Sequence, residues 1–377
     1  MKVLIVSTAE RTGGGAIAAR RLMDALNKNG VQARMLVRDR QTDSPHVFRH
    51  GNIVPKILER IDLMARLRLP LSDTWPYDTG SFGTDILGTR EYQESDIIHL
   101  HWINQGMLSL KQLGQMARDG KRIVWTLHDE WPFSGIKHYG GDIGTDTDIE
   151  DTARFHRLDD KVSRLKKEIY SSCNIHFVGC SKWITGLARK AMPGNDCTHI
   201  NNCIPHDVFH PMDRQEVRRK LNLPPDRKIV MFCSQKVTDT RKGMKYLDEA
   251  LQRLPDVCTV RLGAGGTYVS DEATMAMMYA AADCFVTPSL QDNLPNTIAE
   301  AMSCGTPCVG FDTGGIPEMI HHLQDGYVAR YRDAGDLAQG IGYILQHPGF
   351  CHAAASSAIH DYSESRTARE YIRIYEK

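Results

Sequence analysis

The segment PSLQDNLPNTIAEAMSCGTP, residues 288–307, has the pattern of a strand end, a polar loop and a short helix. The preceding residues 284–287, CFVT, predict a buried strand that leads into it. Pro295 suits the first position of the helix, where its missing N–H has no partner, and Gly305 suits the left-handed position just after the helix end. The segment therefore predicts a strand–loop–helix unit of an α/β protein.

The start of this predicted helix has the chemistry of an anion site. The amides around Asn296 and Thr297 would face the loop, and the helix dipole favours negative charge there. Asp292 and Glu300 flank the helix start, and at ~1.5 Å rise per residue Glu300 lies roughly 6 Å beyond Asn296. An anion site with a carboxylate on each side would suit a ligand made of a sugar, a diphosphate and a ribose, because the carboxylates can bind hydroxyl groups.

The composition is that of a globular protein of two or three domains. The chain has 377 residues, of which 41% are hydrophobic and 24% charged. Basic and acidic residues number 46 each, which excludes an overall basic field for nucleic acid. The ten cysteines form no C-x-x-C pair, which indicates buried thiols in a reducing compartment. No apolar run is long enough for a signal peptide or a membrane span, so a cytoplasmic location is expected.

Short apolar runs alternate with helical patterns along the chain, which predicts βαβ units and parallel sheets. Strands are predicted at 3–7, 33–37, 96–101, 122–127, 175–180, 228–233, 257–262, 284–287 and 308–311. Helices are predicted at 16–29, from 182 after a Ser181 cap, and at 243–254, 271–282 and 363–377. The proline-containing stretch 201–225 has few periodic apolar residues and is interpreted as the connection between two domains.

Residues 288–318, which end in GGIPE, resemble the acidic-X7-acidic motif of retaining glycosyltransferase family 4. The first acid is usually Glu in that family and is Asp292 here, and DNLPNT at 292–297 is most similar to bacterial surface-polysaccharide transferases. The resemblance implies the GT-B fold, with two Rossmann-like doubly wound domains facing a central cleft. The expected domains are 1–205 on the acceptor side, 206–360 for the nucleotide sugar, and a last helix, 361–377, that returns to the first domain.

The resemblance assigns the donor phosphates to the second domain. Arg241-Lys242-Gly243 is similar to the family's Lys-Gly, whose lysine contacts these phosphates, although a solvated surface pair would have the same sequence. The arginine that usually follows the preceding strand is replaced by Ser234, and Arg241 or Lys236 would supply the second cation. The same resemblance implies that Asp292 holds sugar hydroxyls and Glu300 the ribose, with further donor contacts from Asn293, Leu294, Asn296 and Thr297.

The first domain carries two further resemblances. TLHDEWPF at 126–133 resembles a segment whose histidine, here His128, lies beside the reacting sugar, whereas a lone histidine is more often structural. The glycines at 13–15 match the family's N-terminal loop, so Gly14 and Gly15 are expected to approach the donor; a tight turn is the equal alternative. His99 and His101 end another predicted strand and are interpreted as packing or capping residues.

Three other features bear on the function. The D-x-D at 146–148 is interpreted as a solvated acidic loop, and no metal and no cofactor are expected because GT-B transferases generally need none. About twenty residues of the family pattern are absent between Leu254 and Tyr279, near where the nucleotide base usually binds. Residues 53–71 have the pattern of a basic amphipathic helix, which indicates either contact with a membrane surface or a core helix.

The predicted function is transfer of a hexose-type sugar, with retention, from a UDP- or GDP-linked donor to a glycan or lipid-linked acceptor. The resemblance places this reaction in capsule, O-antigen or exopolysaccharide synthesis, on the inner face of the cytoplasmic membrane if the acceptor is lipid-linked. The departing diphosphate, neutralised by Lys242 and the helix amides, would take the acceptor proton. Two alternatives stay open: a nucleotide-sugar epimerase of the same fold, and a non-catalytic sugar-nucleotide-binding subunit.

Overall fold

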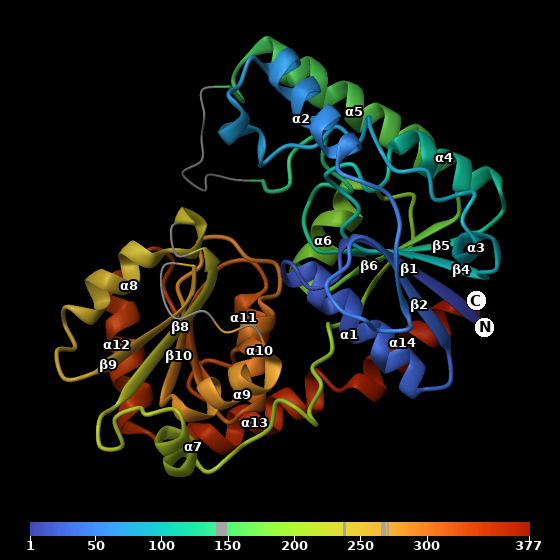
Figure 1. Cartoon of the computed structure of the whole chain (residues 1–377). Helices are drawn as coiled ribbons and strands as arrows, with labels where there is room; N and C mark the ends of the chain where they lie inside the picture. Colours follow the sequence, from blue (N-terminus) through green and yellow to red (C-terminus); the bar gives the residue numbers. More distant parts are fainter. Residues whose placement is uncertain (141–148, 237–238, 265–268, 270) are drawn as a thin grey trace. The chain divides into compact units, whose positions relative to one another are not determined.

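The computed structural model describes residues 1–140, 149–236, 239–264, 269 and 271–377, without the side chains of 235, 236 and 264. The chain divides into two compact units, which are 1–201 with 365–377, and 202–364 (Figure 1). We refer to them as unit 1 and unit 2. Each contains one parallel sheet with helices around it, which confirms the predicted α/β class.

Unit 1 is built on a seven-stranded sheet in the order β3-β2-β1-β4-β5-β6-β7. Its strands are β1 (Lys2–Ala9), β2 (Gln32–Asp39), β3 (Val47–Arg49), β4 (Ile97–Leu100), β5 (Arg122–Leu127), β6 (Ile175–Gly179) and β7 (Cys197–His199). The strand order reverses between β1 and β4, and in open parallel sheets ligands bind outside the carboxyl ends of the strands at such a point. A ligand-binding site is therefore expected at the residues that follow β1 and β4.

The helices of unit 1 connect these strands. They are α1 (Gly14–Lys28), α2 (Val54–Leu67), the 3-10 helix η1 (Leu71–Thr74), α3 (Arg90–Gln93), α4 (Leu110–Arg118), α5 (Ala153–Ser171), α6 (Lys182–Ala191) and α14 (Glu364–Tyr375). The predicted cap of α6 is confirmed, because the Ser181 side chain accepts a hydrogen bond from the amide of Ile184. The predicted start of α1 at Ala16 is wrong by two residues, since the helix begins at Gly14 after Gly13.

Unit 2 is built on a five-stranded sheet in the order β12-β11-β10-β8-β9. Its strands are β8 (Ile229–Lys236), β9 (Cys258–Ala264), β10 (Cys284–Thr287), β11 (Cys308–Phe311) and β12 (Gly326–Ala329). The order reverses between β8 and β10, which places the switch point of this sheet at the carboxyl ends of those two strands. β9 forms one edge of this sheet.

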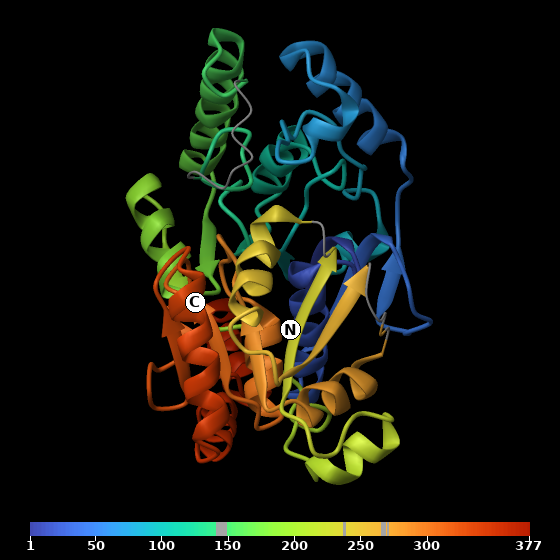
Figure 2. The same cartoon turned by 90° about the vertical axis from the view of Figure 1, so that its left-hand side faces the viewer.

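The helices of unit 2 are α7 (Arg214–Lys220), η2 (Thr240–Lys242), α8 (Met244–Leu251), α9 (Glu272–Ala281), α10 (Asn296–Ser303), α11 (Ile316–Met319), α12 (Ala334–Gln346) and α13 (Phe350–Asp361). α8 packs on α12, and α10 packs on α9 and α13 (Figure 2). α7 lies inside the stretch 201–225 that was interpreted as a connection. α10 begins at Asn296, so Pro295 is its N-cap and not its first residue as predicted, whereas Gly305 has the predicted positive φ of 77°.

Candidate functional site

The loops after β8 and β10 bring a cation and an anion together at the switch point of unit 2. Lys242, at the end of η2, places its Nζ 2.5 Å from Oδ2 of Asp292, which lies in the loop after β10. Both side chains are partly buried, with 29% of Lys242 and 17% of Asp292 exposed. The two residues predicted to act on the donor phosphate and sugar are therefore direct neighbours in unit 2.

Two glycines hold this arrangement through the backbone. Gly243 has φ +65°, and a Cβ there would overlap the carbonyl oxygen of Pro288. Gly314 has φ +58°, and a Cβ there would overlap the carbonyl oxygen of Asp292, which also accepts a hydrogen bond from the amide of Gly315. A side chain at either position would push the loop away. The glycines of the two sequence motifs thus allow two segments to converge on the loop that carries Asp292.

The second cation predicted for the phosphates is less clearly placed. Arg241 donates to the carboxylate of Asp239 through Nε at 3.2 Å and through Nη2 at 2.7 Å. Its carbonyl oxygen accepts a hydrogen bond of 2.7 Å from the amide of Leu290, which ties η2 to the loop after β10. The side chain of Lys236, the other candidate, lies outside the described part of the structure.

α10 begins four residues after Asp292. Asn296 is partly exposed, and its Oδ1 accepts a hydrogen bond of 3.1 Å from Nδ2 of Asn202. Thr297 is also partly exposed, whereas Asn293 and Leu294 are buried in the loop. Of the predicted donor-binding residues in unit 2, the structure therefore leaves Asn296 and Thr297 more accessible than Asn293 and Leu294.

Glu300 lies one turn further along α10 and is buried, with 6% of the residue exposed. Its Oε2 accepts a hydrogen bond of 2.8 Å from the hydroxyl of Tyr279 in α9. This hydrogen bond from Tyr279 fixes the position of the Glu300 carboxylate one turn into α10. The sequence pattern indicated Glu300 but not this partner, which carries no motif of its own.

Unit 1 brings the glycine loop and His128 together at its own switch point. Gly14 and Gly15 open α1 directly after β1, and His128 follows the last residue of β5. A Cβ at Gly15 would lie 3.1 Å from Cγ of His128, so the absent side chain lets the helix start approach the imidazole ring. These predicted site residues are therefore neighbours within unit 1.

His128 is in contact with a second histidine, His101. Nδ1 of His101, directly after β4, lies 2.8 Å from Nε2 of His128, and the two rings stack with centroids 5.1 Å apart. His101 was predicted to be a packing or capping residue, and this contact with His128 was missed. A signal was present, because the residues that follow neighbouring parallel strands meet at one sheet edge.

His99 supports the same cluster from α14. Its Nδ1 lies 2.6 Å from the hydroxyl of Tyr375, and its Nε2 lies 2.8 Å from Oγ1 of Thr126. The hydroxyl of Tyr371 lies 2.8 Å from the same Thr126 oxygen. The last helix of the chain is thus part of the polar network beneath His101 and His128, and the structural interpretation of His99 is confirmed.

These histidines are neutral near pH 7. Burial lowers the pKa of His99 to about 3 and that of His128 to about 4, while the pKa of His101 is also well below its usual value. Burial and the neighbouring histidines are the causes for His101. A neutral His128 can exchange hydrogen bonds with a sugar hydroxyl without placing a positive charge beside it.

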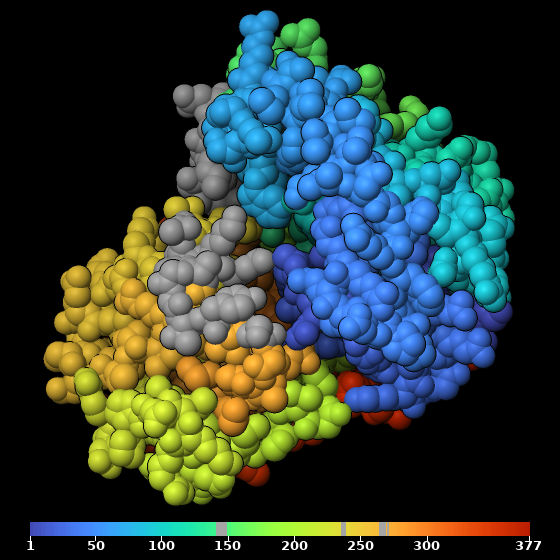
Figure 3. All heavy atoms as spheres, viewed as in Figure 1, coloured from blue at the N-terminus to red at the C-terminus, as the bar shows by residue number. Residues whose placement is uncertain are grey.

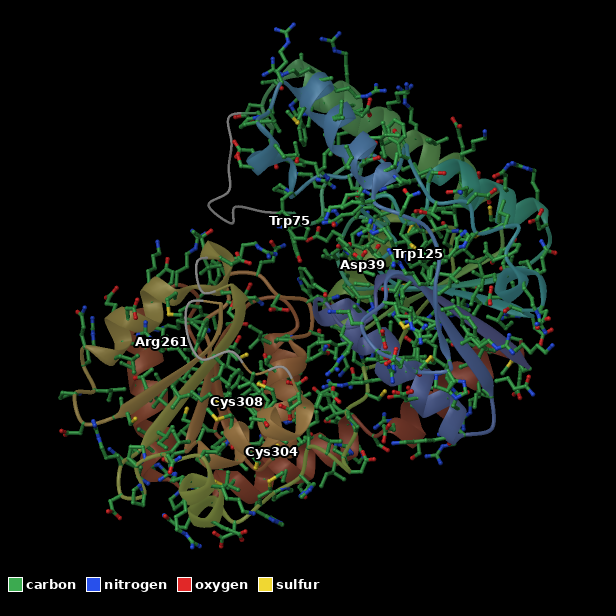
Figure 4. The ribbon with its side chains drawn as sticks, viewed as in Figure 1. Asp39, Trp75, Trp125, Arg261, Cys304 and Cys308 are labelled. Atoms are coloured by element: carbon green, nitrogen blue, oxygen red, sulfur yellow. The ribbon has the colours of Figure 1, made fainter. Side chains whose placement is uncertain are left out.

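Asp129, the residue after His128, organises the aromatic side chains around the cluster. Its Oδ2 accepts from Nε1 of Trp102 at 2.8 Å and contacts Nδ1 of His138 at 2.7 Å. Burial alone would raise the pKa of Asp129, but His138 and these hydrogen bonds keep it below its usual value. Trp75 stacks beside Trp102 and His138 with centroids 6.2 Å from each and is 47% exposed (Figure 4).

The described residues contain no group of three or more His, Cys, Asp or Glu side chains that could hold a metal ion. The D-x-D at 146–148, predicted to be a solvated loop, lies outside the described residues. The ten cysteines, all within the described ranges, are free thiols and at least partly buried.

Comparisons with known proteins bear on both units. Residues 264–347 match the family model "Glycosyl transferases group 1". N-acetyl-alpha-D-glucosaminyl L-malate synthase of Bacillus anthracis is 22% identical over 327 residues, which cover 80% of this chain and 79% of that protein. Sucrose-phosphate synthase from Thermosynechococcus elongatus has a similar fold, with a TM-score of 0.73, 19% identity and coverage of 100% of this chain and 98% of that one. Anabaena HepE, solved in complex with UDP-glucose, has a TM-score of 0.67, 15% identity and coverage of 100% and 99%.

Proposed function

Because residues 264–347 match the model of group 1 glycosyl transferases and the fold is similar to that of sucrose-phosphate synthase, we propose that this chain moves a hexose-type sugar from a nucleotide-diphosphate donor to a sugar or lipid-linked sugar acceptor, with retention at the anomeric carbon. The observation that carries the proposal is the pair of Lys242 and Asp292 beside the start of α10. A cation and helix amides suit a diphosphate, and a neighbouring carboxylate suits the hydroxyls of the attached sugar.

The reaction that fits this arrangement needs strong stabilisation of the leaving group. The bond between the anomeric carbon and the diphosphate oxygen breaks, and the acceptor oxygen forms its new bond on the same face of the sugar. The acceptor proton passes to the departing phosphate oxygen, so no side chain has to remove it. Lys242 and the amides at the start of α10 would neutralise the developing negative charge, which preorganised groups do efficiently.

Unit 1 would contact the sugar from the acceptor side. His128 is neutral and fixed by His101, so it is suited to orient a hydroxyl rather than to carry a proton through the reaction. Because its Nε2 already contacts His101, a sugar hydroxyl would compete for that nitrogen or bind through another atom of the residue. Gly14 and Gly15 would give the donor room close to this ring.

We propose UDP or GDP as the nucleotide, and capsule, O-antigen or exopolysaccharide synthesis as the process. The UDP-glucose complex of HepE, a protein of the same fold, favours UDP for the first experiments. The reaction as written needs neither a metal nor a cofactor, and no nucleic acid takes part. We place the enzyme in the cytoplasm, on the inner face of the cytoplasmic membrane where the acceptor is lipid-linked.

The test is release of nucleoside diphosphate from a panel of UDP-, GDP- and ADP-sugars, with and without a lipid-linked acceptor extract. Wild type is compared with Lys242→Ala and with Lys245→Ala, a control lysine that is exposed three residues further along the chain. The proposal is supported if diphosphate release requires the acceptor, persists in Lys245→Ala and is lost in Lys242→Ala. Conversion of the donor sugar without release would indicate an epimerase, and binding without turnover a non-catalytic subunit.

A further inference from the structure

The exposed apolar side chains of this protein are concentrated in one short segment. Twelve large apolar side chains are exposed among the described residues, and seven of them lie between residues 53 and 75. They are Ile53, Val54, Ile57, Leu58, Ile61, Leu71 and Trp75, with exposures from 41% to 60%. A random scatter over the chain would place about one there. Scattered exposed apolar residues need no explanation, whereas a cluster does.

Four of these side chains form one stripe along α2. Val54, Ile57, Leu58 and Ile61 follow the spacing of a helix face, and at roughly 100° per residue they fall within an arc of roughly 100°. The buried residues of α2, which include Leu63 and Leu67, lie on the opposite side of the helix. The stripe therefore faces away from the buried side of α2, and in Figure 3 the blue stretch of chain that contains α2 lies at the top of the view.

The body-facing side of α2 is anchored by polar side chains as well as by Leu63 and Leu67. Glu59 is fully buried and accepts hydrogen bonds of 2.6 Å from both the amide and the hydroxyl of Thr79. Arg60 donates to the carbonyl oxygens of Thr74 at 2.6 Å and Tyr77 at 3.1 Å. With these side chains turned inward and held, the outward aliphatic stripe has no role in fixing the helix to unit 1.

The surroundings of the stripe are basic. Arg66, whose Nε donates to Asp62 at 2.7 Å, and Arg68 are exposed at and just after the end of α2, and α2 packs against α5. The exposed side chains of α5 include four cations, Arg157, Lys161, Arg164 and Lys167, against the two exposed acids Asp160 and Glu168. This local excess of positive charge stands out in a chain whose net charge is zero.

We propose that the stripe on α2 is a docking surface for an anionic lipid bilayer. Aliphatic side chains would enter the boundary between headgroups and acyl chains, and the cations of α2 and α5 would face the anionic headgroups. The proposal deepens the proposed function, on which it rests for the lipid-linked acceptor that such docking would bring to the enzyme.

A second copy of the chain fits this surface less well. The four exposed aliphatics of the stripe and Ile53 offer an area on the order of 500 Å², against the ~800 Å² per partner of a standard protein interface. The basic residues on both copies would also face one another across a symmetric contact, and like charges oppose association. A bilayer needs no matching surface and supplies the opposite charge.

The experiment measures co-sedimentation of the full chain with vesicles of phosphatidylcholine, alone or mixed with phosphatidylglycerol. The test variant is Ile57→Gln/Leu58→Gln/Ile61→Gln, in which glutamine keeps the helix propensity of α2. The matched control is Leu323→Gln/Ile359→Gln, two exposed aliphatic residues of unit 2. We expect wild type and control to bind the mixed vesicles more strongly than phosphatidylcholine alone, and the test variant to bind roughly a hundredfold more weakly.

Two further measurements keep the result interpretable. Thermal unfolding shows whether the test variant is folded, and we expect no loss of stability because the three side chains are exposed. Sedimentation velocity without lipid is expected to show a monomer for wild type. The proposal is overturned if wild type does not bind the mixed vesicles, if test variant and control bind alike, or if wild type is a dimer that the test variant dissociates. Because no outcome depends on turnover, failure of the docking proposal is distinguishable from failure of the proposed reaction.

Discussion

Neutralising Asp292 is expected to separate diphosphate binding from sugar transfer. In the structure Lys242 shares its charge with Asp292 at 2.5 Å, so a bound diphosphate competes with that carboxylate for the same ammonium group. Asp292→Asn removes the competing charge and the repulsion between carboxylate and phosphate. At roughly 4 Å and an effective dielectric constant near 20, one such charge interaction is worth up to ~4 kcal/mol, and solvent exposure reduces it to about 1 kcal/mol.

We therefore expect Asp292→Asn to bind the free nucleoside diphosphate about fivefold more tightly than wild type, since about 1 kcal/mol corresponds to that factor. Transfer should nevertheless fall at least roughly tenfold, because the asparagine loses a charged acceptor for the sugar hydroxyls. Lys242→Ala should bind the diphosphate roughly thirtyfold more weakly, the value of one charged hydrogen bond of about 2 kcal/mol. The double variant should bind more tightly than Lys242→Ala alone, because no unpaired carboxylate then faces the phosphates.

Isothermal titration calorimetry at one fixed ionic strength measures all four affinities with UDP, or with whichever diphosphate the donor panel identifies. Circular dichroism and unfolding curves verify that each variant is folded. If Asp292→Asn weakens diphosphate binding as strongly as Lys242→Ala, the reasoning is refuted. Asp292 would then serve to position the lysine, and its proposed role toward the sugar would lose its support.

Three other predictions concern the groups around the two switch points. Below about pH 6.5 His99 is protonated in the unfolded chain but not in the folded protein, where its pKa is about 3. The free energy of unfolding should therefore fall as the pH falls, and His99 should account for a loss of about 3 kcal/mol at pH ~4.5, measured by urea unfolding. His99→Gln should show a smaller loss over the same pH range. Gly243→Ala should lose about 2 kcal/mol or more of unfolding free energy, together with affinity for the diphosphate. Gly186→Ala is the control, because Gly186 lies inside α6 and a Cβ added there meets no atom within 4 Å; it should be neutral or slightly stabilising. His101→Leu should lower kcat roughly tenfold with little change in donor affinity. His101→Asn can still reach His128 with a polar atom and should recover part of the lost kcat. Equal effects of the two substitutions would contradict the positioning role of His101.

The sequence predicted the buried strands best. The bounds predicted for β5, β10 and β11 agree with the structure at every residue, because each is a continuous apolar run between polar or glycine-rich segments. β3, β7 and β12 were missed. Each has three or four residues, lies at a sheet edge and contains few large apolar side chains, so neither the length nor the hydrophobic pattern of a strand is present.

Contacts between segments distant in the sequence were harder to predict than the motifs that take part in them. Lys242 and Asp292 are fifty residues apart, and only the order β10-β8 in the sheet places the two loops side by side. His101 and His128 meet because β4 and β5 are neighbours, which the sequence does not state. For α2, the apolar pattern predicted an amphipathic helix but not which side faces outward, because that depends on the burial of Glu59 among its hydrogen-bond donors.

The geometry of the Lys242 site is set by the backbone and not by the ion pair. Gly243 and Gly314 approach the loop after β10 from two directions, and each makes a contact that any side chain would prevent. The hydrogen bond from the amide of Leu290 to the carbonyl oxygen of Arg241 adds a third connection that needs no charged group. Removing either charge should therefore leave the loop in place, so that the substitutions at Lys242 and Asp292 report on the binding of phosphate and sugar. Substitution of the glycines should instead move the whole loop and impair both functions together.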